Sequence, residues 1–187
     1  PLLLAGFLLG VAFAVRFQLA PALLCLVLWT EWRRFRQTMP LVIAGCVAGL
    51  ALDGIIDFAM GEVPFRWFWE NFRVNLIEGK SSEFGESPTY YYLGLLMKRW
   101  SAALGPIIVL AAVGARSFPG LALVAFVHLA AHSLVPHKEY RFVLLSSEIV
   151  VFLAAVGTAD AIKLIRSHRL LWCGVALGAW AAISLTL

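Results

Sequence analysis

Long apolar runs, separated by short clusters of charge, dominate the chain. An α-helix that crosses a membrane needs about 20 mostly apolar residues. Runs of this kind predict six spans, at residues 2–29, 40–60, 90–115, 118–135, 142–158 and 170–187. A polar connection, residues 61–89, joins the second span to the third. The pattern therefore predicts an all-α, polytopic transmembrane helical bundle with no separate soluble domain.

Two of the runs contain helix-breaking signals. The first run is longer than one span and is interrupted by Arg16 and Pro21. Because an arginine inside a membrane is costly, two interpretations stay open: one tilted helix, or two half-helices that meet near residues 16–18. In the third run, Gly105 and Pro106 mark a candidate kink.

The orientation is predicted from the basic clusters between the runs. Cytoplasmic loops carry an excess of Lys and Arg. We therefore expect residues 30–38 and 160–169 to be cytoplasmic turns. Their basic residues are Arg33, Arg34, Arg36, Lys163, Arg166 and Arg169. Alternating crossings then place residues 61–89 and 136–141 on the non-cytoplasmic side, although the outer loops carry as many basic residues as the inner ones.

The composition excludes several classes of protein. Hydrophobic residues make up 61% of the chain and charged residues 14%, against about 45–50% and about 25% in soluble domains. A net charge of +4, spread over several loops, does not indicate a nucleic-acid partner. The three cysteines lie singly inside apolar runs, which predicts neither a disulfide framework nor a metal site. They are Cys25, Cys46 and Cys173.

The connection after the second span has the pattern of an amphipathic helix. Aromatic and aliphatic residues recur at helical spacing on one face: Phe65, Phe68, Trp69, Phe72 and Leu76. Charged residues fall on another face: Glu62, Arg66, Glu70 and Arg73. This predicts a helix that lies in the membrane interface. It is either an anchor between two spans or a platform for a lipid-linked substrate.

Two pairs of ionisable residues lie four positions apart and so share a helix face. Asp53 and Asp57 end the second span, where they are functional candidates or groups that are hydrated or paired with Arg66 or Arg73. His128 and His132 lie inside the fourth span. Because no glutamate stands between them as in H-E-x-x-H zinc sites, we expect structural histidines and no metal.

The segment after the fourth span has the densest chemistry. Four ionisable residues, His137, Lys138, Glu139 and Arg141, fall within five positions. Cations of this kind bind phosphate, arginine through its planar fork and lysine as a point charge. Glu139 could orient His137 or Lys138, or balance their charge. The alternative is an ordinary solvated turn.

Residues 135–142, Val-Pro-His-Lys-Glu-Tyr-Arg-Phe, resemble the H-K-E-x-R-F signature of glycosyltransferase family 22. These are polyprenyl-phosphate-mannose-dependent α-mannosyltransferases of N-glycan and GPI-anchor assembly, with bacterial relatives. Residues 10–18 and Asp53 also fit the family. Further matches follow in the family's order: Asn75, Gly79, Ser81, Ser82, Phe84, Gly85, Pro88, Tyr90, Tyr91 and Tyr92. The chain departs from the family pattern in two places. Thr89 and the three tyrosines stand where members often have Trp-His-Trp-Tyr. The acidic motif of the family is absent and would lie upstream of Pro1.

The resemblance implies an integral-membrane, C-type glycosyltransferase in the bacterial inner membrane or the endoplasmic reticulum membrane. It would transfer mannose or a related hexose from a polyprenyl-phosphate-linked donor to a glycan or glycolipid acceptor, with inversion, on the non-cytoplasmic face. No cofactor, metal or nucleic acid is expected. His137, Lys138 and Arg141 are assigned to the donor phosphate. The supporting residues are Glu139, Asp53, Asn75 and Tyr91. The base is expected upstream of Pro1, so that the chain would be a C-terminal fragment.

Two alternatives belong to other functional classes. A transporter or flippase for lipid-linked substrates typically has inverted repeats with broken helices near the midplane. The sequence shows no such repeat, and its charges gather at one predicted face. The other alternative is a non-catalytic membrane subunit.

Overall fold

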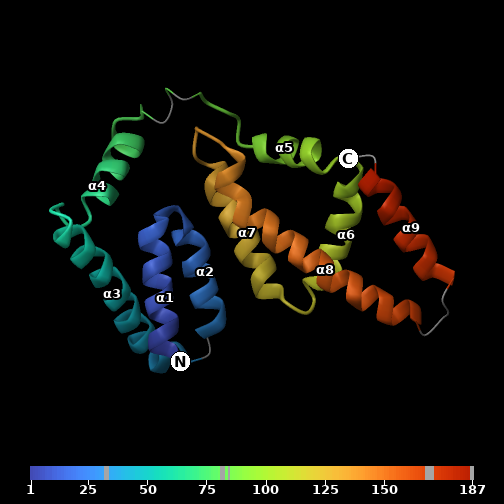
Figure 1. The fold of residues 1–187 in the computed structure, drawn as a ribbon, viewed down its shortest axis with the longest axis horizontal. Coiled ribbons are helices and arrows are strands. Elements are labelled where there is room, and N and C mark those ends of the chain that lie inside the picture. Colours follow the sequence, from blue (N-terminus) through green and yellow to red (C-terminus); the bar gives the residue numbers. More distant parts are fainter. Residues whose placement is uncertain (32–33, 81–82, 84, 167–170, 186–187) are drawn as a thin grey trace. The chain divides into compact units, whose positions relative to one another are not determined.

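The computed structural model describes residues 1–31, 34–80, 83, 85–166 and 171–185, and every regular element in that part of the chain is helical (Figure 1). The prediction of an all-α fold is therefore confirmed. Three helical stretches are long and apolar enough to cross a membrane: Phe35–Ala59, Tyr91–Gly114 and Tyr140–Leu164. Some residues discussed above lie outside the described residues: Arg33, Ser81, Ser82, Phe84 and Arg169, and the side chains of Leu76, Arg166 and Cys173.

The described chain divides into two compact units. Unit 1 consists of Pro1–Pro88 with Leu134–Lys138, and unit 2 consists of Thr89–Ser133 with Glu139–Leu187. The chain passes from unit 1 to unit 2 between Lys138 and Glu139, inside the segment with the family signature. Each unit is described separately below.

The first apolar run of unit 1 forms two half-helices. They are α1 (Leu2–Val15) and α2 (Ala20–Glu31), joined by a short 3-10 turn, η1 (Phe17–Leu19). Arg16 leaves the helical conformation, with φ −155° and ψ 87°. Pro21 lies in the first turn of α2, where a backbone N–H has no intrahelical partner to lose. The 14 residues of α1 rise about 21 Å, which is less than the ~30 Å thickness of a membrane core.

Glycines bring α1 against α3 (Phe35–Ala59) at backbone contact (Figure 1). A Cβ added to Gly6 would lie 2.1 Å from the Val42 carbonyl oxygen, and one added to Gly10 would lie 2.3 Å from that of Cys46. Small residues four apart allow such close packing of membrane helices. Because these contacts advance in step along both helices, α1 and α3 run parallel. Of the two interpretations of residues 2–29, the structure thus has the two half-helices.

The connection after α3 contains the predicted helix. It forms α4 (Arg66–Phe72), which continues into a π-helical turn, η3 (Arg73–Ile77). Phe65 begins α4 with a left-handed backbone, φ 61°. Few residues connect Ala59 to Phe65, so the chain must turn sharply after α3. The left-handed conformation of Phe65 provides that turn.

The third run, at the start of unit 2, breaks before the predicted kink. Helix α5 (Tyr91–Trp100) ends at Ser101, which has φ 44°, and a 3-10 turn, η5 (Ser101–Ala103), leads into α6 (Leu104–Gly114). Pro106 therefore lies in the first turn of α6. A helix continuous through this point would place the proline ring against the carbonyl of residue 102, so the break falls upstream of Gly105-Pro106.

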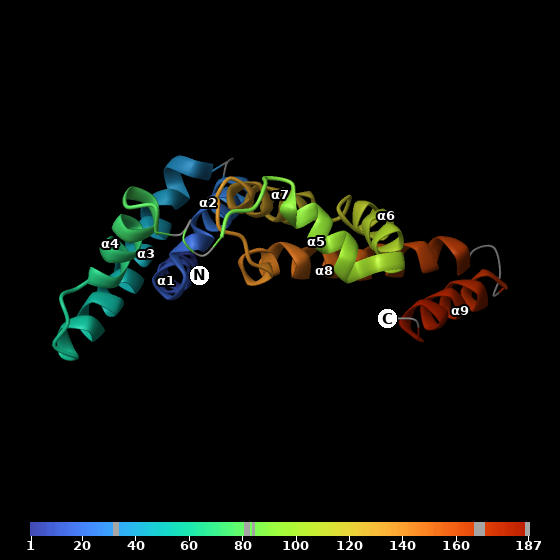
Figure 2. The same cartoon turned by 90° about the horizontal axis from the view of Figure 1, so that it is seen from above.

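The rest of unit 2 packs around α8. The elements are α7 (Pro119–Ser133), η6 (Tyr140–Val143), α8 (Leu144–Arg166) and α9 (Leu171–Leu185). Helices α6 and α8 lie side by side (Figure 2), in contact through Gly114 and Gly157. Helix α8 extends beyond the expected end of its span at residue 158, and Asp160 and Lys163 form an ion pair at 3.0 Å on this extension. The expected turn at 160–169 is thus helical up to residue 166.

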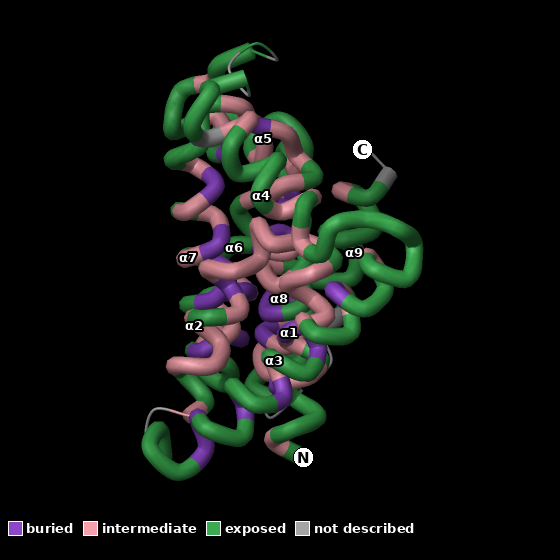
Figure 3. Tube along the Cα trace, turned by 90° about the vertical axis from the view of Figure 1, so that its left-hand side faces the viewer, coloured by how far each residue is buried: buried purple, intermediate pink, exposed green. Residues whose placement is uncertain are grey.

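Much of the described surface is apolar, and only short stretches of each helix are buried (Figure 3). The core of unit 2 is small, with Ile107, Ala111 and Leu153 at its centre. Large side chains such as Phe126 on α7 and Val109 on α6 are 68% and 64% exposed. Lipid tails solvate such side chains without the cost that water imposes. This agrees with a membrane protein.

Candidate functional site

The first half of the signature segment lies in unit 1 and is fixed to the segment 85–88. Lys138 is only 6% exposed. Its ammonium donates to the carbonyl oxygens of Ser87, at 2.8 Å, and Val135, at 2.6 Å. The backbone N–H of Ser87 in turn donates to the Pro136 carbonyl at 3.0 Å. Lys138 therefore joins two segments that are 51 residues apart in sequence.

His137 contacts the same segment. Its Nδ1 lies 3.3 Å from the carbonyl oxygen of Gly85. Because a carbonyl only accepts hydrogen bonds, Nδ1 carries the proton in this contact. Gly85 has φ 97°, a conformation that side chains disfavour. This backbone requirement explains a glycine at that position of the family pattern.

The second half of the signature lies in unit 2. The Arg141 guanidinium binds both carboxylate oxygens of Glu139, Nε at 2.7 Å and Nη2 at 2.8 Å. The Arg141 side chain nevertheless stays 69% exposed. Glu139 thus has Arg141 as an ion-pair partner, whereas His137 and Lys138 were the partners considered for it from the sequence. Between them in sequence, Tyr140 is covered by Arg99, whose Cζ lies 4.3 Å from the ring centroid.

Asp53 and Asp57 both hold α4 in unit 1. The Asp57 carboxylate accepts the backbone N–H of Phe65 at 2.9 Å, which satisfies a donor at the start of α4. The Asp53 carboxylate accepts the indole N–H of Trp67 at 3.2 Å. Pairing with Arg66 or Arg73 was one of the alternatives for these aspartates, and the structure shows backbone and indole donors instead.

The arginines of this region pair along their own helix. Arg66 binds Glu70 at 2.7 Å, and Arg73 binds Glu78 at 3.3 Å. The hydrogen bond to Glu70 and the charge of that carboxylate raise the pKa of Arg66. Both pairs are largely exposed, so they contribute little to stability.

Aromatic rings pack against one side of α4, where Trp67 and Phe68 are half-buried. The Phe68 ring lies 5.4 Å from that of Phe17 and 5.8 Å from that of Phe13, and the Trp67 ring lies 6.2 Å from Phe17. The Phe17–Phe68 pair is edge-to-face and the other two pairs are tilted, and aromatic pairs at such distances are favourable. The hinge near Arg16 and the polar connection therefore pack together within unit 1. Trp69, by contrast, is 64% exposed.

Two predicted residues, Asn75 and Tyr91, have other partners. Asn75, in η3, donates from Nδ2 to the Asn71 Oδ1 at 2.7 Å. Tyr91 is in unit 2, where its ring meets that of Tyr92 edge-on at 5.7 Å. Tyr92 is 1% exposed and lies beside Glu139, so the buried tyrosine next to the signature is not the one that the sequence singled out.

A buried polar cluster joins the ends of α7 and α8 in unit 2. His128 Nδ1 lies 2.8 Å from the Ser146 hydroxyl, which donates to the Ala125 carbonyl at 3.0 Å. The His132 Nδ1 lies 2.9 Å from the His128 carbonyl. The Ser146 hydroxyl donates its one proton to Ala125 and so accepts from His128, and the His128 carbonyl can only accept from His132. Both histidine rings therefore carry a proton on Nδ1. Within the described residues, no group of three His, Cys, Asp or Glu could hold a metal ion.

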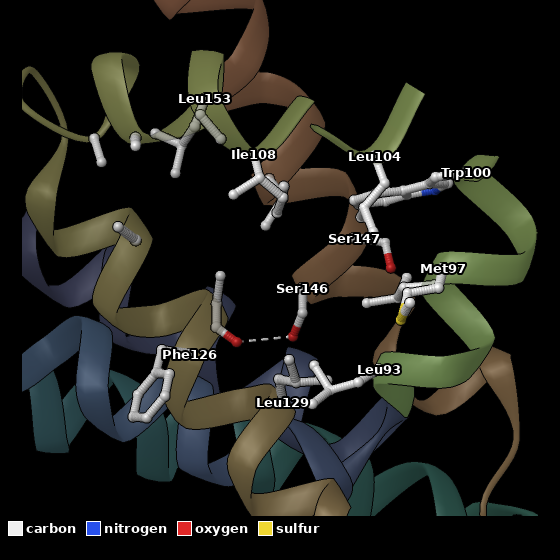
Figure 4. Close-up of a pocket in the computed structure, with 17 residues that line it drawn as sticks. Leu93, Met97, Trp100, Leu104, Ile108, Phe126, Leu129, Ser146, Ser147 and Leu153 are labelled. Carbon is white, nitrogen blue, oxygen red and sulfur yellow. Dashed lines mark hydrogen bonds between the residues drawn. The ribbon is translucent and has the colours of Figure 1, made fainter. Parts of the chain in front are cut away.

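Two cavities in unit 2 were not predicted. The larger, of about 530 Å³, lies among α5, α6, α7 and α8 (Figure 4). The smaller, of about 350 Å³, is lined by Trp100, Tyr140, Ser147 and Glu148 among others. A glutamate inside the apolar run 142–158 is the sequence signal that could have drawn attention to the smaller one, because intramembrane carboxylates are functional candidates.

Comparison with known proteins gives two matches. A family model described as the Alg9-like mannosyltransferase family matches residues 2–187. A curated relative from Schizosaccharomyces pombe, named "Probable Dol-P-Man:Man(7)GlcNAc(2)-PP-Dol alpha-1,6-mannosyltransferase", is 30% identical over 155 residues. That alignment covers 79% of this chain, and the chain spans 28% of the relative's length. No solved structure matches the chain.

Proposed function

This chain belongs to the Alg9-like mannosyltransferase family, and from that premise we propose that it forms the donor-phosphate side of a membrane-embedded mannosyltransferase. The donor is mannose linked to a polyprenyl phosphate, and the acceptor is a lipid-linked glycan. The relative's name specifies a donor and an acceptor that both carry dolichol, which supports lipid-linked substrates in general. The enzyme is multi-pass, with its site on the non-cytoplasmic face.

The proposed reaction is a single displacement. An acceptor hydroxyl oxygen attacks C1 of mannose, and the bond between C1 and the phosphate oxygen breaks. The electron pair of that bond leaves with the polyprenyl phosphate, and the acceptor proton passes to a base. Attack opposite the leaving group inverts the configuration at C1. We assign no base among the described residues, whose part is to bind and stabilise the leaving phosphate.

The observation that carries the proposal is that the Arg141 side chain is held in place and yet exposed. Its fork is held by both oxygens of Glu139, yet most of the side chain is exposed. A guanidinium fixed in this way presents N–H groups to a phosphate with little loss of side-chain freedom. The increase in negative charge on the leaving phosphate then strengthens the interaction in the transition state.

His137 and Lys138 have a second role in the proposal. In the described part of the chain, two carbonyl oxygens accept two of the three ammonium N–H groups of Lys138. We assign the third N–H to a phosphate oxygen. His137 orders the segment at Gly85 through Nδ1, and we assign its imidazole to the donor phosphate as well. Both residues thus bind phosphate while they position the segment 85–88.

The supporting residues act through structure. Asp53 fixes α4 through Trp67. Asn75 is held in η3 by Asn71, at the end of the proposed interfacial helix, where its amide can bind a sugar hydroxyl. Tyr91, beside the buried Tyr92, offers an aromatic face to the acceptor glycan. These assignments follow the family pattern at these positions.

The test is mannose transfer by the full-length protein in proteoliposomes, with polyprenyl-phosphate-mannose and a lipid-linked glycan. We expect Arg141→Ala to lower kcat/KM about 100-fold, and Arg141→Lys to recover part of that loss because it restores charge without the fork. Lys163→Ala is the matched control, since Lys163 is also an exposed cation in an ion pair. Equal activity of Arg141→Ala and the control would refute the role of Arg141.

A further inference from the structure

Glu148 of α8 is a charged residue inside an apolar helical stretch. The stretch Tyr140–Leu164 is long and apolar enough to cross a membrane, and Glu148 lines the smaller cavity of unit 2, of about 350 Å³. The larger cavity, by contrast, is lined by alanines and other apolar residues, with two serines (Figure 4). No ion pair within the described residues includes Glu148. Because a carboxylate in a membrane span is costly without a partner, Glu148 requires a cation that this part of the chain does not supply.

The walls of the smaller cavity favour an organic ammonium ion. Three aromatic residues line it together with Glu148: Trp100 of α5, Tyr140 of η6 and Phe152 of α8. The face of an aromatic ring attracts a cation, and tryptophan does so most strongly. A metal ion needs several ligands, but no group of three His, Cys, Asp or Glu among the described residues could hold one. A carboxylate beside aromatic rings is therefore suited to an ammonium group that carries carbon substituents.

A cation of the protein lies next to the same cavity. The Arg99 guanidinium covers the Tyr140 ring, with Cζ 4.3 Å from the ring centroid, and Arg99 is exposed. A guanidinium stacked on a ring keeps its N–H groups in its own plane, where they can bind a phosphate. The surroundings of Tyr140 thus offer a negative charge, at Glu148, and a positive charge, at Arg99, to one ligand.

This pair of charges matches the head group of a zwitterionic phospholipid. We propose that the smaller cavity binds phosphatidylethanolamine from the surrounding bilayer, with its ammonium at Glu148 and Trp100 and its phosphate at Arg99. An ethanolamine ammonium donates N–H groups to a carboxylate, whereas the quaternary ammonium of choline has none to donate. An anionic phospholipid would leave the Glu148 charge without a partner. The acyl chains lie along exposed apolar residues of α8 such as Val151 and Phe152, which are 49% and 48% exposed.

The test is the binding of defined phospholipids to the full-length protein in detergent, measured by native mass spectrometry. Phosphatidylethanolamine, phosphatidylcholine and phosphatidylglycerol with identical acyl chains are added separately. We expect the wild type to bind phosphatidylethanolamine about tenfold more tightly than either of the others. Glu148→Gln should lower this affinity about tenfold and so remove most of the preference, because glutamine keeps the shape of the side chain without its charge.

Further variants test the other contacts of the head group. Trp100→Leu should lower the affinity for phosphatidylethanolamine about threefold, and Trp100→Phe should recover part of that loss because it keeps an aromatic face. Arg99→Gln should lower the affinities for all three lipids about threefold, since each of them carries a phosphate. Asp160→Asn is the matched control, because Asp160 is a carboxylate of the same helix that pairs with Lys163 and lies outside the cavity lining. Its lipid binding should equal that of the wild type.

The proposal is overturned if Glu148→Gln binds phosphatidylethanolamine as tightly as the wild type does. An equal fall for all three lipids in Glu148→Gln would also overturn it, because phosphatidylglycerol has no ammonium to lose. Displacement of the bound lipid by polyprenyl phosphate would assign the cavity to the sugar donor instead. The inference does not rest on the proposed function, since the binding measurement contains no sugar donor. A full-length protein that binds phosphatidylethanolamine through Glu148 without transferring mannose would refute the proposed function alone.

Discussion

Replacing Lys138 by methionine removes the buried ammonium that joins the signature segment to residues 85–88. The change deletes two charge-assisted hydrogen bonds, to Ser87 and Val135, while the methionine keeps most of the buried apolar stem. Hydrogen bonds to charged groups contribute about 1.5–3 kcal/mol each. Removing the buried charge also removes its desolvation cost, so we expect a net loss of about 3 kcal/mol from the local stability of this contact.

The assay is hydrogen exchange of the full-length protein in detergent, without substrate. The Ser87 amide, bonded to the Pro136 carbonyl at 3.0 Å, reports on the contact directly. A loss of about 3 kcal/mol raises its exchange rate about 100-fold. The Ser117 amide, bonded to the Gly114 carbonyl in unit 2, should be unchanged. Lys98→Met, at an exposed lysine of α5, serves as the control variant. Unchanged exchange at Ser87 in Lys138→Met would refute the idea that this lysine holds the two segments together.

Two other predictions concern the packing of each unit. Gly157→Ala should destabilise unit 2 by about 1–3 kcal/mol, because its Cβ would lie 1.9 Å from the Leu110 carbonyl oxygen. Thermal unfolding in detergent measures this against Gly94→Ala, where a Cβ meets nothing within 4 Å, and equal Tm values would contradict the close contact of α6 with α8. Trp67→Phe keeps the aromatic packing of α4 but removes the donor to Asp53, and should cost about 1–3 kcal/mol. Limited proteolysis measures this, and we expect faster cleavage within residues 61–78 in Trp67→Phe than in the control Trp69→Phe. Identical cleavage of the two variants would contradict the anchoring role of Asp53.

The helical architecture was predictable because it depends on local patterns. Apolar runs of the right length predicted the helices, and the charged Arg16 marked the place where the first run divides. The aromatic spacing in residues 63–78 predicted α4. In each case, the residues that determine the structure are neighbours in the sequence.

The contacts of the candidate site were harder to predict because they depend on partners far away in the sequence. Spacing alone placed Lys138 in a phosphate-binding segment, but its burial follows from the Ser87 carbonyl, 51 residues upstream. Likewise, the sequence offers Asp53 several possible partners in the connection that follows α3: Arg66, Arg73 and the indole N–H of Trp67. The aromatic packing of Trp67 against Phe17 determines which of them it meets.

The apolar cavity was not predicted for a related reason. Its alanines look like ordinary residues of membrane helices, and only the packing of four helices shows that they leave space. Glu148, by contrast, is visible in the sequence as a charge in an apolar run. The structure adds that it lines the smaller cavity together with Tyr140 and Trp100.

Transfer of mannose from polyprenyl-phosphate-mannose by the full-length protein tests the central claim most directly. The reaction is run with radiolabelled donor, and the anomeric configuration of the transferred mannose is determined. The account predicts a mannosylated glycolipid with configuration opposite to that of the donor, and its loss when His137, Lys138 and Arg141 are replaced together by alanine. Retained configuration, or undiminished transfer by the triple variant, would contradict it.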